Sequence, residues 1–167
     1  MTDSQNPTRI LFLDDEPAVL NSLRRSLRKE GYQIFLSTEV DDALRIIHEE
    51  KIDIVVSDHL MPNMTGAEFF ALAARLHPHV LRIMLTGQAD VDVAIRSINE
   101  GHVHRFLTKP WDDAQLKFIL KDAARQIENR RQAEAQPLRT ERARLRSIQR
   151  DAAGAIVLDL AETQAVH

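Results

Sequence analysis

Short apolar runs alternate with amphipathic segments along most of the chain, and this alternation constrains the fold more than any other feature. Each run has the length and aliphatic character of a strand that is buried on both faces, and a segment with apolar residues at helical spacing follows it. The runs are Arg9–Leu13, Tyr32–Leu36, Ile52–Val56, Val80–Leu85 and His104–Leu107. Successive β-then-α units dictate an α/β fold with a doubly wound, parallel sheet of five strands and helices on both faces.

Residues that favour helix ends stand between these runs. Pro17 suits the first turn of a helix, which Gly31 is expected to end. Ser37 and Thr38 are expected to cap the second helix. Thr65–Glu68 has the pattern of a capping box, and Asp112–Gln115 resembles one. The alternation therefore covers residues 9 to about 130.

Composition narrows the class of protein. Of the 167 residues, 44% are hydrophobic and 28% are charged, which is typical of a globular chain with a real core. The formal net charge of −3 argues against general affinity for nucleic acid or membranes. The absence of Cys excludes a disulfide framework, thiol catalysis and thiolate metal sites. No signal peptide and no apolar run of spanning length is found, so a cytoplasmic protein is expected.

Four strands end in side chains that carry chemistry. Asp14 and Asp15 follow the first strand, Asp58 the third, Thr86 the fourth and Lys109 the fifth. The carboxyl ends of strands in such a sheet meet in one crevice, where three carboxylates repel one another and need a cation or a raised pKa. Without Cys, and without a His after the first strand, the donors are all oxygen and suit Mg²⁺. A hard cation, a lysine and a hydroxyl around one carboxylate are what phosphoryl transfer requires.

Together these residues resemble the receiver domain of two-component response regulators, over residues 9 to about 130. The likeness rests on four motifs, which are Asp14-Asp15, Ser57-Asp58 through Met61-Pro62 to Gly66, Thr86-Gly87 and Lys109-Pro110. It implies a flavodoxin-like sheet with the strand order 2-1-3-4-5. The run Arg105–Asp112 looks like that of receivers fused to cyclic-di-GMP phosphodiesterases or to enhancer-binding activators.

The resemblance also implies the role of each site residue. Asp58 would accept a phosphoryl group from the phosphohistidine of a sensor histidine kinase or a phosphotransfer protein. Asp15 would bind Mg²⁺ directly and Asp14 through water, Asp58 would share in the metal site, and the backbone carbonyl of Leu60 would be a further ligand. Lys109 would pair with the phosphoryl group, aided by a cis bond to Pro110.

Two residues would form the switch. Thr86 supplies a hydroxyl beside the acceptor, and Phe106 stands where the family keeps its switch aromatic, although an aromatic in this position also suits core packing.

The protein would catalyse only its own phosphorylation and dephosphorylation, and is not expected to be an enzyme.

Two other functions compete with the phosphoacceptor switch. One is a Mg²⁺-dependent aspartyl-phosphate phosphatase for small molecules, of the haloacid-dehalogenase type. That family carries its nucleophile in an Asp-x-Asp pattern at the end of the first strand, whereas Glu16 holds the third place here. The other is a receiver-like interaction domain without phosphorylation, against which the full set of acids argues.

The domain organisation is expected to have three parts: a flexible N-terminus at 1–8, the receiver at 9–130 and an Arg-rich helical linker or extension at 131–167. Residues 130–150 contain seven Arg against two Glu and are expected to be helical, continuous with the last receiver helix or hinged at Pro137. Leu138, Leu145 and Ile148 would be offered to a partner, with a second copy as the candidate. A homodimer could also form through the last receiver helices.

The segment after residue 130 is too short for an output domain of usual size, so the chain either acts nearly alone or belongs to a longer protein. Direct binding to nucleic acid is not expected, since the Arg-rich segment lacks aromatics and a helix-turn-helix pattern.

Two loop residues are expected to set the lifetime of an aspartyl phosphate, because hydrolysis needs a water in line with the phosphorus. Leu60, two residues after Asp58, can only shield, whereas Gln88, two residues after Thr86, can hold a water through its amide. One apolar shield beside one orienting group predicts a longer lifetime than polar groups at both places.

Overall fold

A computed structural model of the protein describes residues 6–152. Its elements, in chain order, are β1 (Arg9–Leu13), α1 (Pro17–Ser26), β2 (Gln33–Ser37), α2 (Val40–Glu49), β3 (Ile54–Asp58), α3 (Gly66–Leu76), β4 (Leu81–Thr86), the 3₁₀ helix η1 (Gln88–Asp90), α4 (Val91–Asn99), β5 (Arg105–Thr108) and α5 (Asp113–Ala152). Residues 1–5 of the predicted flexible N-terminus and residues 153–167 of the predicted extension lie outside the described residues.

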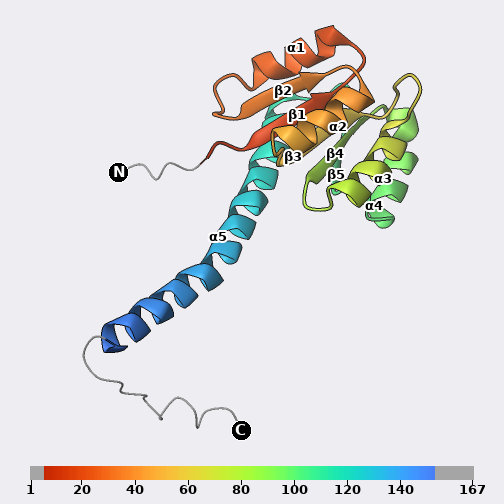
Figure 1. The fold of residues 1–167 in the computed structure, drawn as a ribbon. Helices are drawn as coiled ribbons and strands as arrows, with labels where there is room; N and C mark the ends of the chain where they lie inside the picture. Colours follow the sequence, from red (N-terminus) through yellow and green to blue (C-terminus); the bar gives the residue numbers. More distant parts are fainter. Residues whose placement is uncertain (1–5, 153–167) are drawn as a thin grey trace. The chain divides into compact units, whose positions relative to one another are not determined.

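The five strands form one parallel sheet in the order β2-β1-β3-β4-β5, which confirms the predicted fold (Figure 1). The register places Leu13 of β1 beside Ser37 of β2 and Ser57 of β3, so the carboxyl ends of these strands are level. Asp58 pairs with Leu85, and Thr86 with Thr108, at the same edge. The residues that follow β1, β3, β4 and β5 therefore meet along one edge of the sheet.

Helices cover both faces of the sheet because alternate strand residues point to opposite sides. On one face, α1 and the first turns of α5 pack with strand residues such as Phe12, Val56 and Ile83. On the other face, α2, α3 and α4 pack with strand residues such as Leu11 and Val55. This double cover explains why the strands are continuous apolar runs.

Three local expectations were wrong in detail. α1 ends at Ser26 rather than near Gly31, because the chain tightens into turns in which Arg28 N donates to Arg25 O and Glu30 N to Leu27 O. Ser37 does not cap α2: the helix begins at Val40, and the Ser37 hydroxyl is bonded to Asp42 Oδ2 at 2.9 Å. The third strand runs from Ile54 to Asp58, since pairing with β1 and β4, and not apolar content alone, sets its ends.

Other local signals are confirmed. The Thr65 side chain caps α3 by accepting from the backbone N–H of Glu68 at 3.2 Å. Asp112 precedes α5, and its Oδ1 accepts from the backbone N–H of Ala114 at 3.1 Å. These caps begin helices at the places that the polar residues indicated.

The chain divides into two compact units, Met1–Ile127 and Glu128–His167. Helix α5 is assigned through Pro137, so the segment predicted to be helical after residue 130 is helical as far as Ala152. Within residues 6–152, no helix combines the length and the apolar character needed to cross a membrane.

Candidate functional site

Three carboxylates gather at the carboxyl edge of the sheet. Asp14 and Asp15 leave the end of β1, and Asp58 is the last residue of β3, between β1 and β4 in the sheet. One carboxylate oxygen from each lies within 4.8 Å of the others. Asp14 is 1% exposed and Asp58 is 8% exposed, whereas Asp15 is exposed to solvent. The cluster therefore concentrates negative charge at the surface of the sheet edge, with two of its three carboxylates buried.

Lys109 brings a positive charge to this cluster from the end of β5. Its Nζ lies 3.1 Å from Asp58 Oδ1 and 3.5 Å from Asp14 Oδ2. The backbone N–H of Lys109 donates to the carbonyl of Thr86 at 2.8 Å, which ties the end of β5 to the end of β4. The Lys109–Pro110 peptide bond is cis, as the resemblance implied. The fold thus joins residues that are far apart in the sequence into one charged site.

The pKa values at the site reflect burial and charge. Burial raises the pKa of the Asp14 carboxyl above its usual range, and the hydrogen bond from Glu16 N at 2.9 Å and the charge of Lys109 only partly oppose it. Burial also lowers the pKa of Lys109, but the hydrogen bond and charge of Asp58, together with Asp14, outweigh it, so the pKa of Lys109 is raised. Lys109 therefore stays protonated while it faces both carboxylates.

The two predicted switch residues stand on neighbouring strands. Thr86 ends β4, is fully buried, and donates its hydroxyl hydrogen to the Gly87 carbonyl at 3.2 Å. Phe106 lies in β5, is half-buried, and packs against the core on the face covered by α2, α3 and α4. Phe106 also lines a hollow of about 540 Å³, together with Phe118 of α5.

The two residues expected to tune the lifetime lie in the segments that follow β3 and β4. Leu60 is 61% exposed in the loop after β3. Gln88 is exposed and begins η1, directly after Gly87. Each follows by two residues a strand end that belongs to the site, Asp58 for Leu60 and Thr86 for Gln88.

The sequence placed Gly66 at the end of the acceptor motif and in the capping box of the next helix, and the structure adds a close contact with the acceptor strand. A Cβ at Gly66 would lie 2.8 Å from His59 Cα and still closer to the Asp58 carbonyl oxygen. The Gly66 N–H donates to the His59 carbonyl at 2.8 Å, which closes the loop after Asp58. Only the absence of a side chain allows this approach.

His59 was also missed. Its side chain is 7% exposed, and its Nδ1 has no hydrogen-bond partner within the described part of the chain. The sequence offers no signal for this, because a histidine after a strand usually faces solvent in a turn.

Residues 10–121 match the sequence family of the response regulator receiver domain. Transcriptional regulatory protein GlrR of Escherichia coli (strain K12) is 34% identical over 123 residues, which are 74% of this chain and 28% of that protein. Hydrogenase transcriptional regulatory protein HoxA of Cupriavidus necator is 30% identical over 123 residues, which are 74% of this chain and 25% of that protein. The matched part thus spans about a quarter of the length of these curated relatives.

Solved structures of receiver domains also resemble this chain. The crystal structure of a signal receiver domain of an HD domain-containing protein from Pseudomonas fluorescens Pf-5 is 29% identical in sequence, with a TM-score of 0.72. The likeness covers 79% of this chain and 97% of that one.

Proposed function

The chain belongs to the response regulator receiver family, and from this premise we propose that Asp58 accepts a phosphoryl group from the phosphohistidine of a sensor histidine kinase or a phosphotransfer protein. The observation that carries the proposal is that Asp58 lies in one cluster with the carboxylates of Asp14 and Asp15, with the ammonium of Lys109 3.1 Å from its Oδ1. A nucleophilic carboxylate next to a cation can approach a charged phosphoryl group that it would otherwise repel.

The proposed reaction is a transfer between two residues. An Asp58 carboxylate oxygen forms a bond to phosphorus, the bond between phosphorus and the imidazole nitrogen of the donor breaks, and that nitrogen keeps the electron pair and takes up a proton. Lys109 holds the acceptor carboxylate beforehand and pairs with the phosphoryl oxygens afterwards.

The donor set fits Mg²⁺. Three carboxylate oxygens within 4.8 Å, two of them on buried residues, repel one another and match the preference of this ion for oxygen. We assign Asp14, Asp15 and Asp58 and the backbone carbonyl of Leu60 to its binding. When bound, Mg²⁺ would neutralise charge on the phosphoryl oxygens.

The switch would begin at Thr86. Its hydroxyl donates to the adjacent Gly87 carbonyl at 3.2 Å and can turn to a phosphoryl oxygen on Asp58. Phe106, on the next strand, would then take up the space that Thr86 leaves, which changes the surface over β5 and α5. This chemistry modifies the protein itself, and receivers are signalling switches rather than classical enzymes.

A matched pair of variants tests the acceptor. The protein is incubated with Mg²⁺ and a small phosphodonor, and intact mass is measured before and after mild acid treatment. The wild type and Asp41→Asn, which alters an exposed acid of α2, are expected to gain one labile phosphoryl group. Asp58→Asn is expected to gain none. Labelling of Asp58→Asn at the wild-type level would overturn the assignment of the acceptor. A separate assay for turnover of a phosphomonoester tests the alternative function, and turnover would favour a phosphatase for small molecules.

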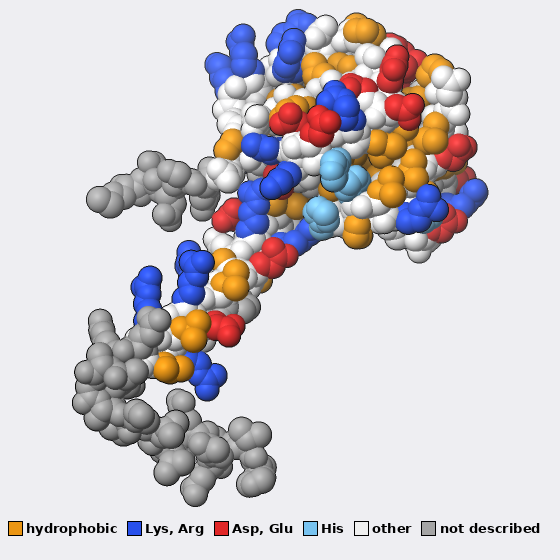
Figure 2. Space-filling view, in the orientation of Figure 1, with side chains coloured by type: hydrophobic (Ala, Val, Ile, Leu, Met, Phe, Trp, Pro, Cys, Tyr) orange, Lys and Arg blue, Asp and Glu red, His pale blue; other side chains and the backbone are white. Residues whose placement is uncertain are grey.

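We further propose that residues 9–130 form the receiver and that 131–167 link it to a partner in the cytoplasm. Leu138 is 64% exposed, Leu145 is 54% exposed and Ile148 is 56% exposed, and Figure 2 shows hydrophobic side chains among charged ones on this part of α5. A second copy could cover them in a coiled coil.

Sedimentation tests this pairing. Leu145→Lys and a chain that ends at Arg130 are expected to sediment as monomers, and Gln136→Lys, at an exposed polar position, as the wild type. Unchanged sedimentation of all three would contradict a dimer through this segment.

A further inference from the structure

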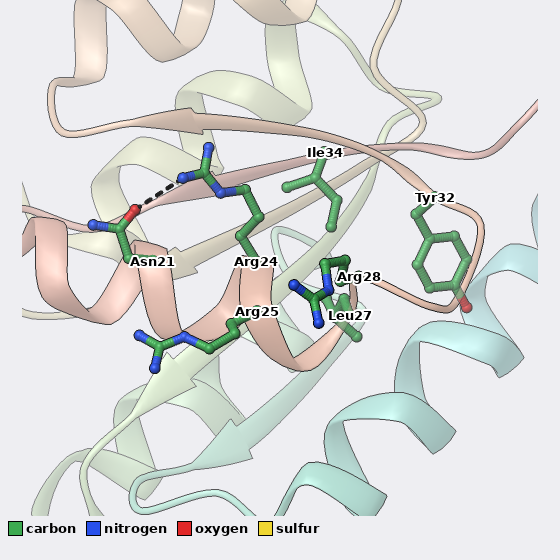
Figure 3. Close-up of a pocket in the computed structure, with 7 residues that line it drawn as sticks. All are labelled: Asn21, Arg24, Arg25, Leu27, Arg28, Tyr32 and Ile34. Atoms are coloured by element: carbon green, nitrogen blue, oxygen red, sulfur yellow. Dashed lines mark hydrogen bonds between the residues drawn. The ribbon is translucent and has the colours of Figure 1, made fainter.

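A second charged site lies away from the acidic cluster. A hollow of about 710 Å³ is lined by Asn21, Arg24, Arg25, Leu27, Arg28, Tyr32 and Ile34, and no acidic side chain is among these lining residues (Figure 3). Tyr32 and Ile34 stand where β2 begins, whereas Asp58 stands where β3 ends, so the two sites belong to opposite edges of the parallel sheet. The size is within the usual range for small-molecule sites.

The helical repeat brings the polar lining together. Asn21, Arg24, Arg25 and Arg28 have the spacing i, i+3, i+4 and i+7, which places them along one side of α1 and of the turn after it. Figure 3 shows Arg24 and Arg25 extending from the last turn of α1 and Arg28 from the turn after it, with the Arg24–Asn21 hydrogen bond drawn. Ile34 lies near Arg28, and the Tyr32 ring lies on the far side of Arg28 with its hydroxyl directed away from the arginines. That bond, from Arg24 Nη2 to Asn21 Oδ1, is 3.3 Å long.

The guanidinium charges of this hollow are not neutralised by carboxylates. Within the part of the chain that the structure describes, Arg24, Arg25 and Arg28 make no ion pair. Arg45 of α2 shows the contrast, since it pairs with Asp42 at 2.6 Å and with Glu49 at 2.8 Å. Figure 2 shows Lys and Arg side chains gathered over α1, in a chain whose net charge is −3.

The helix dipole explains only part of this cluster. Arg24 and Arg25 stand in the last turn of α1, where positive charge is favourable. Arg28 lies beyond the end of the helix and adds a third positive charge beside them, which increases their repulsion. An anion in the hollow would relieve that repulsion.

The rest of the lining is apolar or aromatic. Ile34 and Tyr32 are half-buried and offer carbon surface next to the cations, whereas Leu27 is buried beneath them. Burial, with the nearby charge of Glu30, raises the pKa of the Tyr32 hydroxyl, which therefore remains a hydrogen-bond donor at neutral pH. The hollow thus combines a cationic side with an apolar side.

We propose that this hollow binds a nucleoside diphosphate, with the phosphates on Arg24, Arg25 and Arg28 and the nucleoside against Ile34 and Tyr32. Planar guanidinium groups bind phosphate oxygens in pairs, which makes arginine the usual residue for such recognition. A nucleoside diphosphate carries about three negative charges at neutral pH, which matches three guanidinium groups.

Calorimetry on the full chain, with ADP as the probe, tests the proposal. The titrations contain a chelator, which keeps Mg²⁺ out of the acidic cluster. They are run at low salt, so that screening is weak and the carboxylates of that cluster repel ADP. ADP is expected to bind wild type and Asp58→Asn alike. Pyrophosphate and adenosine are each expected to bind about tenfold more weakly than ADP, since each lacks one half of the contacts.

Variants locate the site. Arg24→Gln with Arg28→Gln is expected to lower the affinity for ADP by about tenfold or more. Arg75→Gln is the matched control, because Arg75 is exposed and also stands in the last turn of a helix, α3; its affinity is expected to stay within about twofold of wild type. Thermal unfolding of the double variant, compared with that of the wild type, checks that the fold is intact.

Three results would overturn the proposal. The first is no ADP binding, or ADP binding that Arg24→Gln with Arg28→Gln leaves unchanged. The second is pyrophosphate binding as tight as that of ADP, which would show that the apolar side of the hollow does not bind the nucleoside. The third is binding of an acidic peptide but not of ADP at these arginines, which would make the hollow a docking site for a protein chain. None of these results depends on whether Asp58 accepts phosphate.

Discussion

Where β3 and β4 begin, the charged side chains of Asp53 and Arg82 are hydrogen-bonded by the fold itself, whereas at the carboxyl-terminal edge of the sheet three carboxylates gather around Lys109. Arg82, which is 4% exposed in β4, donates to the carbonyl oxygens of His102 at 2.7 Å and Val80 at 2.9 Å. Asp53, just before β3, accepts from the Arg9 backbone N–H at 2.8 Å. The hydrogen-bonded side chains of Arg82 and Asp53 stabilise the fold. The crowded carboxylates at the carboxyl-terminal edge cost stability, but they can hold a cation and a phosphoryl group.

Arg82→Ala carries the largest expected effect and tests the amino-terminal edge. The change leaves the carbonyls of Val80 and His102 without the guanidinium that binds them, in a buried place. Loss of several hydrogen bonds to a charged group is expected to lower the free energy of unfolding by about 3 kcal/mol. Urea denaturation measures it, with Arg75→Ala as the control at an exposed arginine, where the change is expected to be under about 0.5 kcal/mol. Equal changes in the free energy of unfolding of Arg82→Ala and Arg75→Ala would show that Arg82 has no special structural role.

Gly66→Ala is expected to have the next largest effect, at the carboxyl-terminal edge. The new Cβ would press on His59 Cα at 2.8 Å and on the Asp58 carbonyl, so the loop after β3 must move. We expect a loss of about 2 kcal/mol in the free energy of unfolding and slower phosphorylation of Asp58. Gly87→Ala is the matched control, since the nearest atom to its Cβ, Asp90 Oδ2, is 3.9 Å away and its φ is −68°. If Gly66→Ala behaves like Gly87→Ala in both measurements, the close approach does not constrain the site.

Mg²⁺ is expected to stabilise the protein through the carboxyl-terminal edge. At ten times its Kd, a ligand that binds only the folded state adds about 1.4 kcal/mol to the free energy of unfolding. Thermal unfolding in Mg²⁺ and in chelator measures the difference, which is expected in the wild type and in Asp41→Asn. Asp15→Ala, which removes one carboxylate of the cluster, is expected to show none. A stabilisation of equal size in Asp15→Ala would place the ion elsewhere.

The smallest expected effects concern the lifetime of the phosphorylated state. Leu60→Asn introduces a polar group at the exposed side of the site and is expected to speed dephosphorylation, while Gln88→Ala is expected to slow it. Each change is expected to be about tenfold or less, because the groups orient water without transferring a proton. The measurement is the loss of phosphorylated protein after excess chelator is added. Gln33→Ala, on strand β2, is the control. Unchanged decay in both variants would show that these side chains do not reach the attacking water.

The sequence by itself determined the α/β class and the chemistry of the carboxyl-terminal edge. Apolar runs that end in Asp14, Asp58, Thr86 and Lys109 predict which side chains meet, because parallel strands bring their carboxyl ends to one edge. Polar residues such as Thr65 and Asp112 also predicted helix starts, since a cap acts on backbone groups only two or three residues away.

Only the tertiary structure decided contacts between residues far apart in the chain. The carbonyl partners of Arg82, the approach of Gly66 to Asp58 and the lining of the hollow by α1 and β2 depend on how elements pack. The end of α1 at Ser26 and the ends of β3 depend on turn and strand pairing in the same way. Local periodicity predicts which face of an element is apolar, but the partner across that face is set by shape and burial over the whole sheet.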